Sequence, residues 1–114
     1  MDYKTARSFL IDQASITEMG QPDTFLLRLQ EGKPPIPGQV TSILLALKVV
    51  FDGLKDAAAL DRQLVYALYV LGFDSRQLFD RGEQTGVTWP PLLDEDITRI
   101  ATAVRSIFSG TWQA

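Results

Sequence analysis

Few side chains in this sequence have the types and spacing of a catalytic or binding site. The most suggestive of these is the Gly32-Lys33 pair, which precedes a long apolar segment as in a phosphate-binding loop. A phosphate-binding loop needs glycines before a lysine and a serine or threonine directly after it. Here Pro34 and Pro35 follow instead, and proline has no N–H group to offer a phosphate. We therefore expect a stiff connector at this point, followed by a core helix.

The start of that helix still carries groups that suit a weak anion site. Backbone N–H groups at the beginning of a helix attract anions, and two hydroxyl side chains lie beside them in the sequence. The candidate residues are Gly38, Gln39, Thr41 and Ser42.

Three consecutive acids, Asp94, Glu95 and Asp96, raise the possibility of a magnesium site. Neighbouring residues on a helix point about 100° apart, so the three carboxylates do not converge. Acidic residues also suit the positive end of a helix. We therefore expect no metal here, and we expect Glu95 to pair with Arg99 one turn later.

A lysine in the most apolar segment is the remaining candidate for catalysis. A lysine stem commonly covers apolar surface while its ammonium group reaches water, and Asp52 lies one turn after Lys48 as a partner. Tyr66 and Tyr69 stand at helical spacing, which is typical of residues at the edge of a core. The sequence thus predicts no catalytic residue and no cofactor.

Composition excludes several classes of function. The chain contains no cysteine and no histidine, which excludes disulfides, zinc-thiolate sites and cysteine catalysis and removes the commonest general base. Its 14 acidic and 11 basic residues give a net charge of -3, without the basic footprint of a nucleic-acid binder.

The longest apolar run, Val40 to Phe51, is shorter than the roughly 20 residues of a membrane helix. With charges near the N-terminus where a signal peptide would be apolar, we expect a cytoplasmic protein without membrane contact.

Apolar residues recur at helical spacing along most of the chain, and no strand-like alternation of useful length occurs. The pattern predicts a single all-α domain over residues 1–114, a bundle of four or five helices. Gly20 and Pro22 should separate the first two. The predicted helices are residues 2–16 with Asp2 as N-cap, Phe25 to near Gly32, Val40–Leu54, Leu60–Arg81 and Leu92–Gly110.

Two proline pairs, each followed by a helix, are the best candidates for a binding surface. Tryptophan is enriched at interaction hot spots, so the second pair and the residue before it resemble an exposed platform. The alternative is a stiff corner that packs Trp89 over a helix end. The candidate interaction surface comprises Pro34, Pro35, Ile36, Trp89, Pro90 and Pro91.

Three runs carry a family resemblance over nearly the whole chain: GKPPIPGQVTSILLALKVVFDGL, LDRQLVYALYVL and GVTWPPLLDEDITRIATAVRSIF. The chain resembles a set of small cyanobacterial proteins of unknown function that are often labelled dethiobiotin synthetase. That label implies an ATP-dependent ligase that closes the ureido ring of dethiobiotin from a diamine and carbon dioxide. The Gly-Thr-Asp-Thr…Gly-Lys-Thr phosphate loop of such ligases is absent, so no catalytic residue is carried over.

The leading hypothesis is a helical protein-interaction or assembly module without catalytic activity. Its partner is a protein whose identity the sequence does not give, and the surplus of apolar residues on two helices favours a homodimer. One alternative is a ligase or accessory factor of biotin synthesis that works with carboxylates and lysines. Another is a small-ligand carrier with a pocket between the third and fourth helices, lined by Leu47, Phe51, Leu68 and Tyr69.

Overall fold

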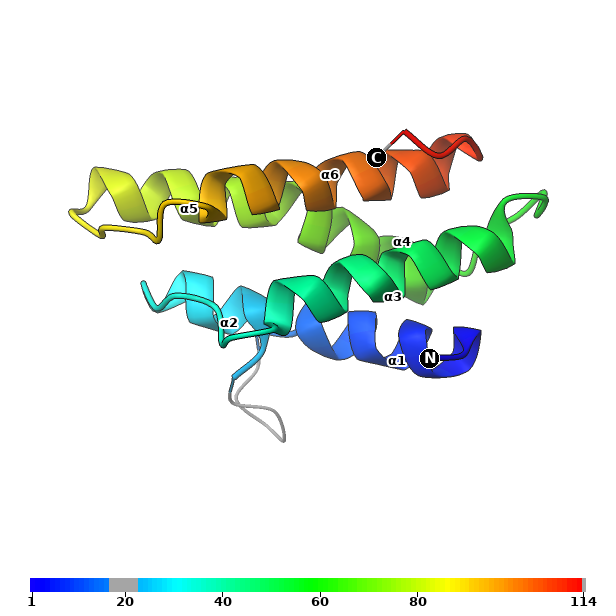
Figure 1. The fold of residues 1–114 in the computed structure, drawn as a ribbon, viewed down its shortest axis with the longest axis horizontal. Coiled ribbons are helices and arrows are strands. Elements are labelled where there is room, and N and C mark those ends of the chain that lie inside the picture. Colours follow the sequence, from blue (N-terminus) through cyan, green and yellow to red (C-terminus); the bar gives the residue numbers. More distant parts are fainter. Residues whose placement is uncertain (17–22, 114) are drawn as a thin grey trace.

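Helices form wherever apolar residues recur at helical spacing, and together they build an all-α bundle (Figure 1). The computed structural model describes residues 1–16 and 23–113, and these contain no strand. Gly20 and Pro22 lie outside the described residues. The elements are α1 (Tyr3–Gln13), α2 (Phe25–Gln30), α3 (Gln39–Leu54), α4 (Arg62–Tyr69), the π-helical segment η1 (Val70–Asp74), α5 (Ser75–Gln84) and α6 (Leu93–Ser109).

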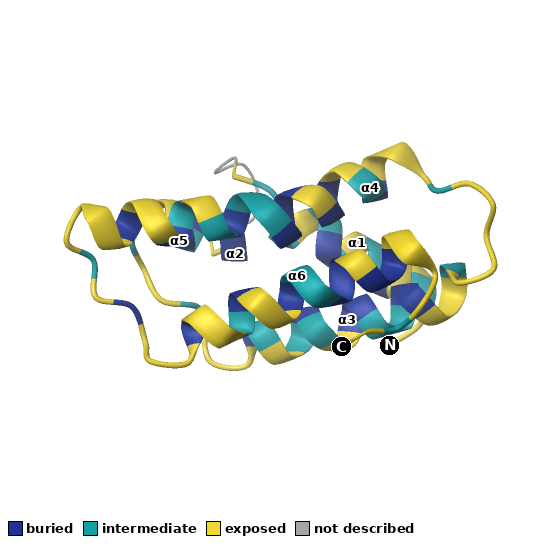
Figure 2. Cartoon of the chain, turned by 90° about the horizontal axis from the view of Figure 1, so that it is seen from above, coloured by how far each residue is buried: buried dark blue, intermediate teal, exposed yellow. Residues whose placement is uncertain are grey.

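Helix α3, where the sequence predicts a core helix, is the central helix of the bundle. It packs against α1 on one side and α6 on the other, while η1 packs against α6 and α2 packs against α5. Buried residues lie on the inner faces of the helices, and exposed residues lie on the outer faces and in the loops (Figure 2). The fully buried side chains of α3 that form the centre of the core are Ile43, Ala46, Leu47 and Val50.

The predicted fourth helix is one continuous helical stretch from Arg62 to Gln84, but its middle has π-helical geometry. The N–H group of Ser75 donates to the carbonyl of Val70, five residues earlier. At this point the backbone approaches α6 closely, because a Cβ atom on Gly72 would lie 3.1 Å from Val104. The spacing of the apolar residues does not indicate this π-helical turn. The helical stretch ends at Gln84, three residues beyond the predicted end at Arg81.

After α6 the chain reverses and packs back onto the bundle. Gly110 has a φ of 78° and caps the helix. The ring of Trp112 then lies 5.1 Å from the ring of Phe51, with the ammonium group of Lys48 4.5 Å from its centroid. Lys48 also pairs with Asp52 at 3.3 Å, which confirms the predicted partner. The tail therefore covers part of α3.

The first and fourth helical segments are joined by polar contacts at one end of the bundle. Arg7 Nε donates to Asp61 Oδ2 at 2.6 Å, and Arg7 Nη2 donates to the side chain of Gln63 at 3.1 Å. Asp61 also accepts the N–H group of Gln63 at 3.0 Å, so it is the N-cap of α4 rather than a first-turn residue. Asp2 caps α1 through the N–H group of Thr5, as predicted.

Within the described parts of the chain, none of the helices combines the length and the apolar character needed to cross a membrane.

The Arg7–Asp61 contact predicts a pH-dependent stability. The hydrogen bond from Arg7 holds the pKa of Asp61 below its ordinary value of 3.8. A carboxyl whose pKa is lowered in the folded state stabilises the fold fully above its unfolded pKa, and this contribution is lost as the pH falls through the lower folded pKa. We expect Asp61→Asn to have a lower Tm than the wild type at pH 7, and the difference to shrink as the pH falls below 3.8.

Thermal unfolding followed by circular dichroism between acid and neutral pH tests this expectation. Asp56→Asn, an exposed aspartate in the loop before α4, is the matched control and should leave Tm unchanged. A Tm difference between Asp61→Asn and wild type that stays constant with pH would contradict the proposed linkage.

Candidate functional site: the groove between two proline corners

Two loops with similar backbone geometry lead into the long helices α3 and α6 at the same end of the molecule (Figure 1). The first corner, residues 31–38, connects α2 to α3, and the second corner, residues 85–92, connects α5 to α6. Each contains a glycine just past the end of its helix, Gly32 with φ 74° and Gly86 with φ 97°. These left-handed conformations favour glycine, because a Cβ atom makes them strained.

Both glycines belong to Schellman motifs, in which the chain beyond a helix bonds back to its last turn. Lys33 N donates to Arg28 O and Val87 N donates to Gly82 O, each at 2.8 Å. The Gly-Lys pair of the sequence is therefore a helix cap, and the Lys33 ammonium group pairs with Glu31 at 3.4 Å.

The two corners also end alike. The N–H group of Gln39 donates to Ile36 O at 2.9 Å, and that of Leu93 donates to Pro90 O at 3.1 Å. The spacing from the capping glycine to these residues is the same in both corners. The sequence contains no repeat that would reveal this, because the match lies in backbone hydrogen bonds rather than in residue types.

The corners are neighbours in space, and a groove of about 240 Å³ lies between them. A Cβ atom on Gly32 would lie only 3.2 Å from the side chain of Val87, which shows how closely the corners pack. The residues that line this corner groove are Pro35, Ile36, Gly38, Val40 and Thr41 from the first side, and Pro90, Leu92, Leu93 and Asp96 from the second.

Most of the predicted interaction residues lie at or beside the corner groove. Ile36 is 39% exposed and lines it, whereas Pro34 and Pro91 are exposed outside its lining. The carbonyl of Pro34 accepts a hydrogen bond from Arg28 Nε at 2.6 Å. Leu92, 65% exposed, was missed by the sequence analysis. The sequence feature that could have indicated Leu92 is a leucine directly after a proline pair and just before a helix.

Trp89 is not part of an exposed platform, and here the structure corrects the sequence prediction. Its side chain is buried, stacked on Phe79 at 5.8 Å between ring centroids. Its Nε1 donates to the carbonyl of Phe79 at 3.0 Å, and its ring lies against Gly82. The alternative, a stiff corner that packs Trp89 over a helix end, describes the structure.

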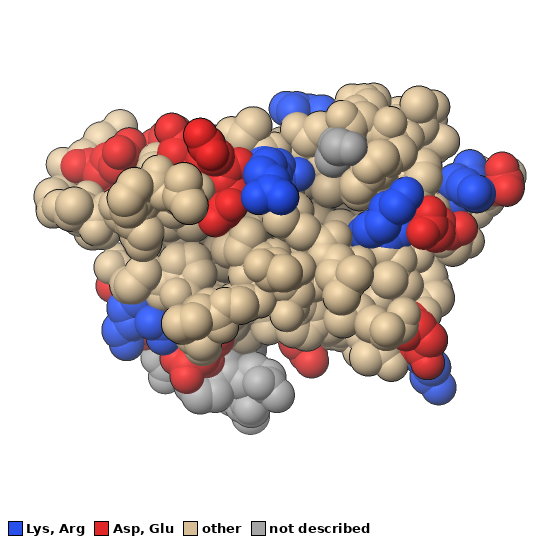
Figure 3. Space-filling view, in the orientation of Figure 1, with Lys and Arg blue, Asp and Glu red and all other residues tan. Residues whose placement is uncertain are grey.

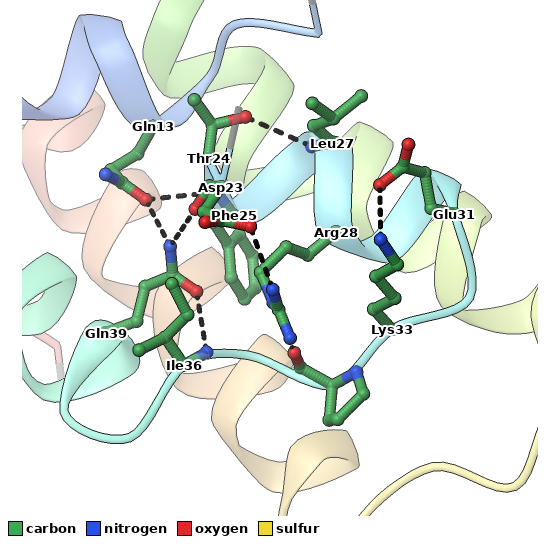
Figure 4. A network of polar contacts seen from close by, with 11 residues as sticks. Gln13, Asp23, Thr24, Phe25, Leu27, Arg28, Glu31, Lys33, Ile36 and Gln39 are labelled. Atoms are coloured by element: carbon green, nitrogen blue, oxygen red, sulfur yellow. Dashed lines mark hydrogen bonds and ion pairs between the residues drawn. The ribbon is translucent and has the colours of Figure 1, made fainter. Parts of the chain in front are cut away.

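A buried amide holds the first corner in place (Figure 4). Gln39 Nε2 donates to the side chain of Gln13 and to the carbonyl of Asp23, both at 2.9 Å. Gln39 Oε1 accepts the N–H group of Ile36 at 3.1 Å, and Gln13 also accepts the N–H group of Phe25. One side chain therefore ties α1, the start of α2 and the first corner together.

Of the residues that the sequence assigned to an anion site, this network uses the side chain of Gln39. The amide of Gln39 is fully engaged, and Asp23 lies in the same hollow as Gly38, Gln39 and Ser42. Thr41 shares the corner groove with Asp96. Each of these carboxylates is paired with an arginine, Asp23 with Arg28 at 3.0 Å and Asp96 with Arg99 at 3.5 Å. The anion site stays a prediction.

The acidic triplet of α6 is partly neutralised. Arg76 pairs with Asp94 at 2.7 Å, and its second nitrogen donates to the hydroxyl of Thr98 at 2.8 Å. Arg99 pairs with Asp96 at 3.5 Å, three residues away, rather than in the expected pair with Glu95. In the described ranges no group of three or more Asp, Glu, His or Cys residues is placed to hold a metal ion.

The pocket expected for a small-ligand carrier lies in a packed region. Leu47 and Leu68 are fully buried, Phe51 is covered by Trp112, and Tyr69 is 49% exposed.

Comparison of the chain with protein-family models, with curated proteins and with solved structures finds no match. The family resemblance drawn from the sequence therefore stays a prediction.

Replacing Gly82 with alanine should destabilise the protein by about 1–3 kcal/mol, because it overpacks the core. The added Cβ would lie 2.5 Å from Trp89 Cζ2, and the ring cannot retreat without losing its hydrogen bond to Phe79. Urea denaturation measures the effect. Gln84→Ala, exposed on the same helix, is the control and should change stability by less than about 0.5 kcal/mol. A Gly82→Ala protein as stable as wild type would contradict this account of Trp89.

Replacing Gln39 with leucine should cost about 1–3 kcal/mol and loosen the first corner, because it leaves buried polar groups unpaired. Amide hydrogen exchange is the direct measurement, and the N–H group of Ile36 should exchange faster in the variant. Gln30→Leu, exposed on α2, is the matched control. Unchanged exchange at Ile36 would show that Gln39 does not hold the corner.

Proposed function

We propose that this protein is a small helical interaction or assembly module whose corner groove binds a short segment of a partner protein. The segment carries one or two large apolar side chains followed by a lysine or arginine. The observation that supports this most is the exposure of Ile36 and Leu92 on facing corners that are themselves held rigidly.

Rigidity matters because a surface that is already ordered loses little entropy when it binds. Prolines fix the backbone of both corners. The amide of Gln39 holds the first corner and the buried ring of Trp89 holds the second. Neither Ile36 nor Leu92 needs to move to meet a partner.

The volume of the groove favours side chains over a whole small molecule. Pockets for small ligands usually enclose about 300–1,000 Å³. The corner groove is smaller and open, so it suits one or two apolar side chains from a larger chain.

Charge supports a basic residue in the partner. Acidic side chains gather at the end of the molecule where α6 begins (Figure 3). Asp96 lines the corner groove, and Glu95 beside it takes part in no ion pair with the described residues. A lysine or arginine next to the apolar segment would meet the carboxylate of Asp96, which Arg99 also contacts at 3.5 Å.

The proposal includes the cytoplasm as the place of action and requires no catalytic step or cofactor. It is supported by a chain without cysteine, which draws no benefit from an oxidising compartment.

Selection from a peptide library, followed by fluorescence polarisation with the purified protein, tests this function. We expect selected peptides to combine large apolar residues with lysine or arginine. Leu92→Asp and Ile36→Asp should each weaken their binding by about tenfold or more. Leu45→Asp is the matched control, since Leu45 is 54% exposed on α3 but lies outside the groove.

Added salt should weaken binding, because it screens the attraction between the basic residue and the acidic end of the molecule. Selected peptides without the apolar-basic combination would refute the proposal. So would equal loss of binding in the Leu92→Asp and Leu45→Asp proteins.

A further inference from the structure

Two hydrogen bonds in series link the end of α1 to one wall of the corner groove (Figure 4). The N–H group of Ile36 donates to Gln39 Oε1 at 3.1 Å, and Gln39 Nε2 donates to Gln13 Oε1 at 2.9 Å. Ile36 lines the groove, whereas neither glutamine does. A side chain of α1 is therefore connected to the groove without being part of it.

The oxygen at the α1 end of this series has a fixed position. Gln13 is the last residue of α1, one turn after Leu10, which is fully buried. Gln13 Oε1 also accepts the N–H group of Phe25, the first residue of α2, at 3.0 Å. A carbonyl oxygen has two lone pairs, so these two bonds use its full capacity. Anchored to both helices, this oxygen fixes the amide of Gln39.

Both glutamines line a hollow of about 430 Å³ that borders the corner groove. The hollow and the groove share two lining residues, Ile36 and Gly38. Ile36 therefore lies between the glutamines and the space that a partner segment would occupy. A shift of the two amides would move a residue that the partner contacts.

The other wall of the groove, which carries Leu92, is held in a different way. In the described ranges, the hydrogen bonds of the second corner go back to α5 or stay at the corner itself. Trp89 fixes this wall because its ring is buried and stacked on Phe79. Loss of the Gln13 oxygen should therefore release one wall and leave the other in place.

We propose that Gln13 is a positioning residue of the corner groove, which sets the place of Ile36 through Gln39. This inference rests on the proposed function and adds the residue that controls one half of the site. Without the oxygen of Gln13, one N–H group of Gln39 lacks a partner, and the amide turns toward water. Ile36 then loses its fixed position and has to be ordered when the segment binds, which weakens binding.

Fluorescence polarisation with a fluorescein-labelled peptide from the selection tests the role of Gln13. Gln13→Leu fills nearly the same space but removes the acceptor oxygen, and should weaken binding by about threefold or more. Gln13→Glu keeps an oxygen at that place and should stay within about twofold of wild type. Gln77→Leu makes the same change at an exposed position of α5 outside the groove, and should have no effect.

A double-mutant cycle separates positioning of Ile36 from general damage to the fold. In an Ile36→Ala background, Gln13→Leu should weaken binding by less than about twofold further, because the side chain that it positions is gone. In a Leu92→Ala background, Gln13→Leu should weaken binding by the same factor as in the wild type. A merely structural role would weaken binding equally in the two backgrounds, and this result would overturn the inference.

Amide hydrogen exchange gives a second readout that needs no peptide. The N–H group of Ile36 should exchange faster in Gln13→Leu and at the wild-type rate in Gln13→Glu. Circular dichroism monitors folding, and Gln13→Met, whose sulfur is only a weak acceptor, replaces Gln13→Leu if that variant unfolds.

The outcomes distinguish this inference from the proposed function. Peptide binding that Leu92→Asp weakens but Gln13→Leu leaves unchanged would overturn the role of Gln13 alone. A Gln13→Glu protein that binds as weakly as Gln13→Leu would do the same. A wild-type protein that binds no library peptide would overturn the proposed function and this inference with it.

Discussion

Both chain reversals at the corner end depend on a glycine that adopts a left-handed conformation, Gly32 after α2 and Gly86 after α5. Any other residue would raise the energy of this backbone by about 1–2 kcal/mol. The reversals send α3 and α6 back along the bundle side by side, and Val87 packs against Gly32 where the two turns meet. The position of the central helix, the groove and the buried ring of Trp89 all follow from these two turns.

The helices could be predicted because burial of one helix face produces a periodic pattern of apolar residues along the sequence. Val40 to Leu54 is the clearest case, since neighbours three and four residues apart share a face. No such pattern indicates that Trp89 is buried, because its pocket is formed by Phe79 and Gly82 of the preceding helix. A glycine inside a helix usually has a packing reason, so Gly82 was the available signal. The π-helical turn at Gly72 was hidden for a similar reason, since the close approach to α6 that accompanies it is a tertiary contact.

The corner groove combines rigid walls, exposed apolar side chains and nearby acids, which suits a short segment of another chain.

The equal spacing of the corners has a consequence for sequence divergence. Loss or gain of one residue between Gly32 and Gln39 would rotate α3 by about 100° relative to the turn that precedes it. The apolar face of α3 would then leave the core, and Gln39 would no longer reach Gln13. The same holds between Gly86 and Leu93. These loops should therefore accept substitutions more readily than length changes, whereas surface loops in general tolerate insertions. In homologous chains, the two capping glycines together with the length of the loop after each would mark this fold.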